Sequence, residues 1–367
     1  MIRKLICFLM PVLILSCDGD PGFVLNGQLS GAGNIYVYLA RPGPGGAEII
    51  DSARVEDGSF RFAGRLETPE PYILSAKGYR EQKLFFLENE VISFTGSTDS
   101  IHCAVIDGSV TDSEYSEYES MIRPLNRRIL TLFDNHHDAV YSGDNVIIES
   151  VDTERINSDI VSSALRFVRE HPASFASPYI LLSLQADLST DSLDQLTGIL
   201  APGVKTSSQY QILQQSIDRM RSLEPGNPAP DFTQPSHTGT SFRLSETTGD
   251  GPLLIYFWAS WCSSCTDATA EIATLYRRYQ GSGLKVVSVS LDFSASDWID
   301  AVKRDSMEWV NVSDLELWDN SVAVRYNVTE IPFFYLVDSD GVIVARGDDA
   351  SLLDSLILAE LRKQGRR

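Results

Sequence analysis

The chain has 367 residues, of which 43% are hydrophobic and 22% are charged. These fractions are those of globular proteins and exclude a disordered, fibrous or multi-pass membrane protein, while the length predicts two or three domains. The 30 basic and 50 acidic residues leave a formal net charge of −20. A surface this anionic repels phosphate backbones, so we expect no nucleic-acid partner.

The first 16 residues have the pattern of a secretion signal. Two basic residues precede an apolar run that is too short to cross a membrane as a helix. The run ends at Ile14–Cys17, which resembles a bacterial lipoprotein box, where cleavage leaves a cysteine that carries lipid. We expect residues 1–16 to be removed and Cys17 to anchor a tether, residues 17–22, to a membrane of the cell envelope on its periplasmic side. The alternative is a plain secretion signal.

Residues 23–111 predict an all-β, sandwich-like domain. Apolar and polar residues alternate around Val37, and the pair Asp57-Gly58 within Val55–Phe62 is a strong signal for a hairpin of two strands. Several short strands at regular spacing favour a sandwich or a small barrel. Further strands are predicted at Tyr72–Ala76, Leu84–Leu87 and Val91–Phe94.

Residues 112–224 predict a helical connector. Apolar residues recur at helical spacing between Ile156 and Val168, and Pro172 ends that run. Three prolines between Glu224 and Pro230 exclude regular structure and mark the next boundary. Further helices are predicted at Tyr179–Leu188, Ser192–Leu200 and Ser207–Leu223.

Residues 225–367 predict an α/β domain, because strands and helices alternate there and would form a mixed sheet covered on both faces. The turn Asp338–Gly341 should join the last two strands. The predicted strands are Leu253–Trp258, Lys285–Leu291, Phe333–Val337 and Val342–Arg346, and the predicted helices are Cys262–Tyr279, Ala295–Arg304, Trp318–Tyr326 and Leu352–Arg362.

Cys262 and Cys265 lie where the first of these strands passes into a helix. The unpaired N–H groups and the positive end of the helix dipole stabilise an anion, so we expect a lowered thiol pKa. Residues three apart share one side of a helix, so the second sulfur can reach the first and resolve a mixed disulfide. We predict that Cys262 attacks and that the more buried Cys265 resolves, with no cofactor.

The motif Trp258–Cys265 (WASWCSSC), followed by Thr329–Pro332 (TEIP), resembles the thioredoxin superfamily. Together with the segment Gly226–Phe232 and the lipoprotein-like start, it is most similar to the envelope-anchored TlpA-like thiol:disulfide oxidoreductases. The N-terminal part is similar to a β-domain of unknown function that often precedes such domains. The resemblance thus implies a multidomain chain that ends in a thioredoxin fold.

The resemblance also implies how the site works. The bond before Pro332 should be cis and face the dithiol, the backbone of Ile331 should pair with substrate, and Trp261 should bind substrate at the rim of the site while Trp258 lies in the core. The implied partners are protein disulfides or dithiols and a membrane or periplasmic redox partner. The implied role is disulfide exchange in the envelope, of which cytochrome c-type biogenesis is one example.

Three positions depart from the family pattern. Many relatives have proline directly before the second cysteine, where this chain has Ser264, which places a hydroxyl near the sulfurs. Relatives carry a proton-accepting carboxyl group six residues before or after the first cysteine, where this chain has Tyr256 and Ala268. We therefore expect proton transfer to rely on water.

Other interpretations of the cysteine pair remain open. It could be an inert disulfide, or half of a zinc site, although His237 and Cys103 have no matching spacing and we expect no metal. A thiol peroxidase shares the Pro228–Phe232 segment, but Trp258 stands four residues before Cys262, where peroxidases have threonine. The chain could also be a non-enzymatic binding lipoprotein with this domain as scaffold.

We expect Cys103 to be a buried or half-buried small apolar residue.

Overall fold

The computed structural model describes residues 22–43, 46–142, 150–247, 249 and 251–364. Within them the chain forms two compact units that divide near residue 116. The predicted signal, Cys17 and most of the tether lie outside the described residues. No helix in the described ranges is both long enough and apolar enough to cross a membrane.

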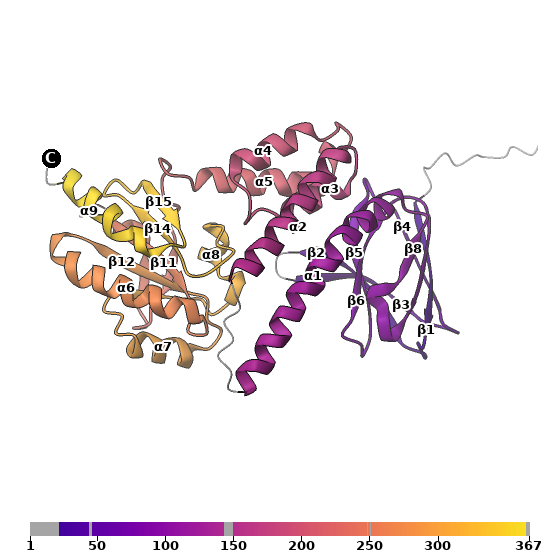
Figure 1. Ribbon diagram of the computed structural model, residues 1–367, viewed down its shortest axis with the longest axis horizontal. Helices are drawn as coiled ribbons and strands as arrows, with labels where there is room; N and C mark the ends of the chain where they lie inside the picture. The colour runs from indigo at the N-terminus through magenta and orange to yellow at the C-terminus, as the bar shows by residue number, and fades with distance from the viewer. Residues whose placement is uncertain (1–21, 44–45, 143–149, 248, 250, 365–367) are drawn as a thin grey trace, which may run out of the picture. The chain divides into compact units, whose positions relative to one another are not determined.

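The first unit contains two four-stranded sheets (Figure 1), with strand orders β4-β1-β7-β8 and β3-β2-β5-β6. Strands β1 and β7 are parallel, whereas β1 and β4 are antiparallel. The strands are β1 (Phe23–Ser30), β2 (Tyr36–Gly43), β3 (Gly46–Arg54), β4 (Ser59–Gly64), β5 (Glu70–Ala76), β6 (Gln82–Leu87), β7 (Val91–Ser97) and β8 (Val105–Asp107), and a 3-10 helix, η1 (Thr98–Cys103), precedes β8.

One hydrophobic core joins the two sheets, which confirms the predicted all-β class of this region. Phe94 of β7 contacts Phe85 of β6 with ring centroids 6.0 Å apart, and it also contacts Phe60 of β4 at 5.8 Å. The ring of Phe60 covers Gly27 of β1, where an added Cβ would lie 2.0 Å from the ring. A residue without a side chain is therefore needed at this point of the sheet.

The predicted hairpin over Val55–Phe62 was wrong, although its turn is present. Asp57 and Gly58 have positive φ angles of 49° and 76°, as a tight turn requires. However, β3 joins the sheet of β2 while β4 pairs with β1, so a single bridge between Glu56 and Ser59 is what remains of the ladder. The Asp57-Gly58 pair determines the local turn, whereas the burial of the β4 side chains determines which sheet β4 joins.

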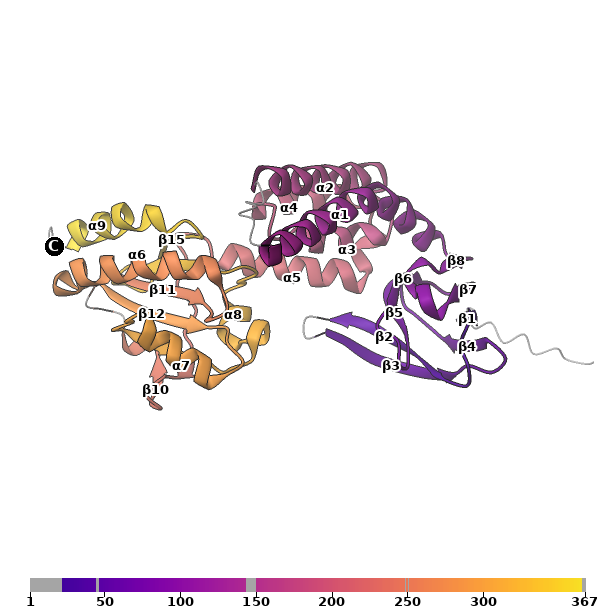
Figure 2. The ribbon, with the colours of Figure 1, turned by 60° about the horizontal axis from the view of Figure 1, so that its bottom comes forward.

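The second unit begins with helices, as predicted for the connector. Tyr118 of α1 contacts Phe167 of α2 with ring centroids 5.7 Å apart, and Figure 2 shows α1 and α2 side by side. The side chains of Ser189 and Ser207 cap α4 and α5. The helices are α1 (Val110–Ser142), α2 (Ser150–Glu170), α3 (Ala176–Ser183), α4 (Thr190–Ile199), η2 (Val204–Thr206) and α5 (Ser208–Ser222).

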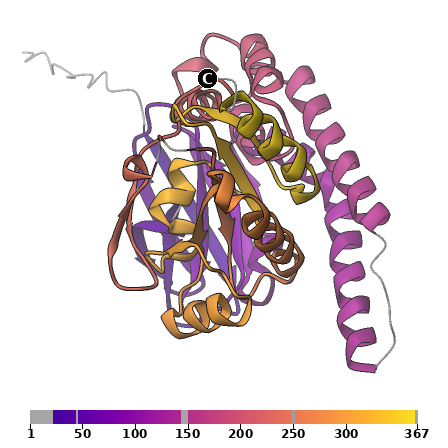
Figure 3. The same cartoon turned by 90° about the vertical axis from the view of Figure 1, so that its left-hand side faces the viewer.

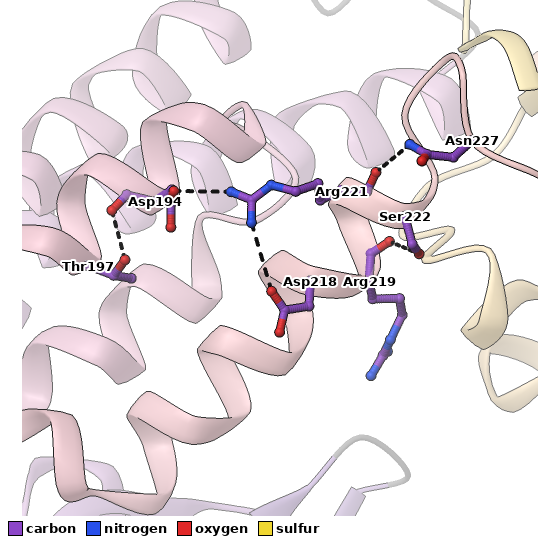
Figure 4. A network of polar contacts seen from close by, with 7 residues as sticks. All are labelled: Asp194, Thr197, Asp218, Arg219, Arg221, Ser222 and Asn227. Carbon is purple, nitrogen blue, oxygen red and sulfur yellow. Dashed lines mark hydrogen bonds and ion pairs between the residues drawn. The ribbon is translucent and has the colours of Figure 1, made fainter.

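The end of α5 is held in place from two sides (Figure 4). Arg221 forms an ion pair with Asp194 of α4 at 3.1 Å, and Asn227 donates to the carbonyl of Arg221 at 3.0 Å. Leu223, directly after α5, is fully buried in the core of the C-terminal α/β domain. The proline-rich segment that follows then runs along the last strand, with the N–H of Gly226 donating to Ile343.

The α/β domain has a five-stranded mixed sheet of order β13-β12-β11-β14-β15. Strands β11, β12 and β13 are parallel to one another, whereas β14 is antiparallel to both of its neighbours, β11 and β15. The first and third predicted strands match β11 and β14, and the others lie within one residue. The strands are β9 (Thr233–Pro235), β10 (Ser241–Arg243), β11 (Leu253–Trp258), β12 (Lys285–Ser290), β13 (Val310–Val312), β14 (Phe333–Val337) and β15 (Ile343–Gly347), with η3 (Leu244–Glu246) after β10.

Helices cover both faces of this sheet (Figure 2). Asp354 of α9 (Leu353–Gln364) accepts hydrogen bonds from Arg278 and Tyr279 of α6 (Ser263–Tyr279), both at 2.8 Å, so these two helices share one face. Helix α7 (Ala295–Arg304) covers the other face. Figure 3 faces this domain, with α9 in yellow. Short turns η4 (Gln280–Ser282) and η6 (Ala350–Leu352) follow α6 and precede α9.

The helix predicted over Trp318–Tyr326 is divided into η5 (Leu317–Asp319) and α8 (Ser321–Arg325). Asn320 divides them, because its side chain accepts hydrogen bonds from the N–H groups of Val322 and Ala323 and thereby starts a new helix. Since the three parallel strands all end at one edge of the sheet, the loops after β11, β12 and β13 lie together there. This edge carries the cysteine pair.

Candidate functional site

Cys262 and Cys265 are joined by a disulfide bond of 2.07 Å at the start of α6. Cys262 is the N-cap of the helix, and its sulfur accepts a hydrogen bond from the N–H of Cys265 at 3.1 Å. The exposed fraction is 9% for Cys262 and 1% for Cys265. An approaching sulfur can thus reach Cys262, whereas Cys265 can be reached only from within the domain.

The loop before β14 closes one side of the cysteine pair. The peptide bond between Ile331 and Pro332 is cis, and the carbonyl oxygen of Ile331 lies 3.8 Å from the sulfur of Cys262. Ile331 and Pro332 are both half-buried, so this loop is partly exposed beside the sulfur. The structure therefore brings together residues that are 69 positions apart in the sequence.

Ser264 also lies close to Cys262. Its hydroxyl oxygen is 3.4 Å from the sulfur of Cys262. In the reduced protein this hydroxyl could donate a hydrogen bond to the Cys262 thiolate, beside the N–H of Cys265. The hydroxyl expected near the sulfurs from the sequence is therefore in place.

Tyr256 occupies one of the two positions where the family resemblance implies a carboxyl group. Its hydroxyl donates to the carbonyl of Cys265 and contacts the hydroxyl of Thr269, each at 3.1 Å. Tyr256 is 1% exposed, and burial raises its pKa. It is therefore neutral at physiological pH and acts as a hydrogen-bond donor, not as a base.

The two tryptophans of the motif differ in exposure, as predicted. Trp258 is buried in the domain core, whereas Trp261 is 48% exposed at the rim. The ring of Trp261 contacts that of Trp318, with centroids 6.3 Å apart and planes 60° apart. Trp318 lies in η5, after β13, and sequence reasoning missed it because no local motif connects the two residues.

Asp292 is a second residue that sequence reasoning missed. Its carboxylate is 1% exposed and accepts hydrogen bonds from the N–H of Ser260 at 3.1 Å, from the hydroxyl of Ser260 at 2.5 Å and from that of Ser290 at 2.7 Å. It thereby holds the loop that leads into Cys262. A polar residue just after a buried strand, beside the strand that carries the motif, is the signal that could have found it.

Comparisons with known proteins agree with this geometry. Residues 225–346 match the AhpC/TSA family model, and residues 23–115 match a domain of unknown function, DUF4369. The thiol-disulfide oxidoreductase ResA of Bacillus subtilis (strain 168) is 25% identical over 135 residues, which are 37% of this chain and 73% of ResA. A solved thiol-disulfide oxidoreductase from Bacteroides fragilis NCTC 9343 is 30% identical, with 35% of this chain and 97% of that chain covered and a TM-score of 0.34. The C-terminal α/β domain is thus an AhpC/TSA thioredoxin-like domain whose relatives are named thiol-disulfide oxidoreductases.

A second solved structure, the thioredoxin domain of a thiol-disulfide oxidoreductase from Bacteroides vulgatus, is 27% identical, covers 37% of this chain and 96% of that chain, and has a TM-score of 0.35. The AhpC/TSA match lies in the C-terminal α/β domain, and the DUF4369 match lies in the N-terminal β-rich region. The multidomain architecture expected from the sequence, with a β-rich region, helices and this thioredoxin-like domain, is confirmed.

Two further candidate residues, Cys103 and His237, are also described by the structure. Cys103 is exposed, so the prediction of a buried apolar role was wrong. Cys103 is the last residue of η1, and the buried side chains of η1 are those of Thr98 and Ile101. His237 lies beside β13, where its ring nitrogen is 3.3 Å from the carbonyl of Asn311. In the described ranges, no group of three or more His, Cys, Asp or Glu side chains is arranged to hold a metal ion.

Proposed function

We propose that this oxidoreductase exchanges disulfides with proteins of the cell envelope, with Cys262 as the attacking thiol and Cys265 as the resolving thiol. The observation that carries the proposal is the unequal exposure of the two sulfurs at a helix N-terminus. The accessible sulfur receives a backbone N–H and lies beside a hydroxyl, which favours its anionic form. The buried sulfur reacts within the domain.

In the reducing direction, the Cys262 thiolate attacks one sulfur of a substrate disulfide, and the other substrate sulfur leaves as a thiolate that takes a proton from water. The Cys265 thiolate then attacks the sulfur of Cys262 and releases the first substrate sulfur. Two electrons pass from the dithiol to the substrate, and the domain is left with the disulfide between Cys262 and Cys265. Oxidation of a substrate dithiol runs through the same steps in reverse.

The loop of the cis bond is the proposed binding site for the substrate backbone. The carbonyl of Ile331 lies beside the Cys262 sulfur and can accept a hydrogen bond from an extended substrate segment. Pro332 and the exposed ring of Trp261 would lie on either side of that segment. These three residues are the substrate-binding residues that the family resemblance implies.

We further propose that Cys17 carries lipid and holds the chain at the periplasmic side of a membrane. The support is the lipoprotein-like sequence at Ile14–Cys17 and the envelope setting of the resemblance. The test is to fractionate cells that produce the wild type or Cys17→Ala. The wild type should sediment with membranes and the variant should not; an unchanged distribution would contradict the anchor.

Reduction of insulin disulfides by dithiothreitol tests the proposed reaction. The wild type should accelerate the reduction, and Cys262→Ser should abolish the acceleration because no attacking sulfur remains. Hydrogen peroxide consumption, measured in parallel, distinguishes this activity from a thiol peroxidase. No acceleration by the wild type, or peroxide consumption without disulfide reduction, would overturn the proposal in favour of a scaffold or a peroxidase.

A further inference from the structure

Several exposed apolar side chains of the oxidoreductase domain belong to loops at the edge that carries Cys262. Because β11, β12 and β13 are parallel, the loops that follow them place Trp261, Phe293 and Trp318 at one edge of the sheet. Four residues of these loops form what we call the apolar rim, with their exposed fractions: Trp261 at 48%, Phe293 at 66%, Leu317 at 39% and Trp318 at 43%.

Two contacts connect the loops of the apolar rim. The rings of Trp261 and Trp318 touch, so the loop after β11 meets the loop after β13. The carboxylate of Asp292, which precedes Phe293, holds the backbone and the hydroxyl of Ser260, which precedes Trp261. The three loops of the apolar rim are therefore connected to one another at the edge that carries the attacking sulfur.

The loops at this edge carry acidic side chains and no basic ones. Seven Asp or Glu residues and no Lys, Arg or His occur in the five loops 259–262, 291–294, 313–320, 327–332 and 348–352. Asp292, Asp314 and Asp349 accept hydrogen bonds from serine side chains of the domain. The others, Glu316, Asp319, Glu330 and Asp348, are exposed.

Glu330 shows that negative charge is crowded here. It directly precedes Ile331, and its pKa is raised by partial burial and by the nearby carboxylates of Asp348 and Asp187. A cationic group bound at this edge would relieve the repulsion among these carboxylates.

We propose that the apolar rim and the acidic loops bind an extended polypeptide segment in which apolar and basic side chains flank the reacting cysteine. This inference rests on the proposed function, because the segment must bring its sulfur to Cys262. Large aromatic side chains supply most of the affinity at protein interfaces, and fixed charges select the partner and speed its approach. The surface thus favours one class of substrate among all accessible disulfides.

Three disulfide-linked peptide dimers of equal length test the inference. In the first, Lys and Phe flank the cysteine; in the second, Glu replaces Lys; in the third, Ser replaces Phe. The prereduced full chain is mixed with each dimer, and the second-order rate constant of reduction is measured, with uncharged hydroxyethyl disulfide as the reference. We expect the Lys and Phe peptide to react roughly tenfold faster than the other two at low salt, and its advantage over the Glu peptide to shrink in high salt.

Variants of the rim separate binding from chemistry. Trp318→Ala should lower the rate constant for the Lys and Phe peptide roughly tenfold and leave the reaction with hydroxyethyl disulfide unchanged. Ile212→Ala, which removes a comparably exposed apolar side chain on α5, is the matched control and should change neither rate.

Equal rates for the three peptides, or an unchanged peptide rate in Trp318→Ala, would overturn this inference while the proposed function stands. No reaction with any peptide or with hydroxyethyl disulfide would overturn the proposed function, and this inference with it.

Discussion

The N–H of Cys265 donates to the sulfur of Cys262 at 3.1 Å, so Cys265 contacts Cys262 through its backbone as well as through the disulfide. Cys262 thereby acts as the N-cap of α6. The unpaired N–H groups of a helix start favour negative charge on the atom that caps them. In the reduced protein we expect this contact to stabilise a thiolate at Cys262, as the proposed attacking role requires.

The hydroxyl of Ser264 should add to this stabilisation. Ser264→Ala removes the donor that lies 3.4 Å from the Cys262 sulfur, so less thiolate should be present at neutral pH. We expect alkylation of Cys262 by iodoacetamide to slow by about threefold to tenfold, which corresponds to the loss of a hydrogen bond that contributes roughly 0.7 to 1.4 kcal/mol. Ser263→Ala, a neighbouring exposed serine, is the control and should react like the wild type. Equal rates in the two variants would rule out this role.

Three buried tyrosines predict a loss of stability at alkaline pH. Burial raises the pKa of Tyr256, Tyr326 and Tyr335, and each hydroxyl donates to a backbone carbonyl. In the unfolded chain they ionise near pH 10, whereas in the folded chain they stay protonated. Their contribution to the free energy of unfolding is therefore full below about pH 10 and falls above it, by up to about 1.4 kcal/mol per pH unit for each group.

Urea unfolding of the oxidised protein at about pH 8 and about pH 11 measures this effect. The wild type should lose stability between the two, and Tyr326→Phe should lose less, because one ionising group is absent from its unfolded state. Tyr79→Phe, at an exposed position, should behave like the wild type. A stability that does not change with pH would contradict the prediction.

Asp292 should be needed for both stability and reactivity. Asp292→Ala leaves the N–H of Ser260 and the hydroxyl of Ser290 without their acceptor, which should cost about 2 to 4 kcal/mol in the free energy of unfolding. Because the freed loop leads into Cys262, insulin reduction should also slow. Asp300→Ala, at an exposed position on α7, is the control for charge removal. Wild-type unfolding and turnover in Asp292→Ala would refute the positioning role.

Gly27 should tolerate no side chain. A methyl group there would lie 2.0 Å from the ring of Phe60, so Gly27→Ala should destabilise the β-domain by about 1 to 3 kcal/mol. Gly33→Ala is the matched control, because an added Cβ at Gly33 meets no atom within 4 Å. Thermal unfolding of the two variants distinguishes them, and the same Tm in both would argue against close packing at this position.

The elements of the oxidoreductase domain could be predicted because local patterns decide them. Leu253–Trp258 is an unbroken apolar run that is buried on both sides, and this pattern indicates a central strand. Ala295–Arg304 begins after Ser294, whose side chain caps the helix. The dithiol was also predictable, since its position at a strand-to-helix turn can be read from adjacent residues.

Other elements and contacts could not be predicted, because distant residues decide them. Strand β13 has three residues, too few for a pattern, and the partner sheet of the strand after Asp57-Gly58 depends on burial rather than on the turn. The roles of Asp292, Phe293 and Trp318 depend on the order of three parallel strands. No spacing in the sequence connects these residues to Cys262.

Trapping of the mixed disulfide tests the central assignment most directly. Prereduced Cys265→Ala, incubated with a disulfide-linked peptide dimer, should gain the mass of one peptide on Cys262, because the resolving thiol is absent. Cys262→Ala should gain none, since the sulfur of Cys265 is buried. Stable peptide attachment to Cys265 in Cys262→Ala, with none on Cys262 in Cys265→Ala, would contradict the assignment.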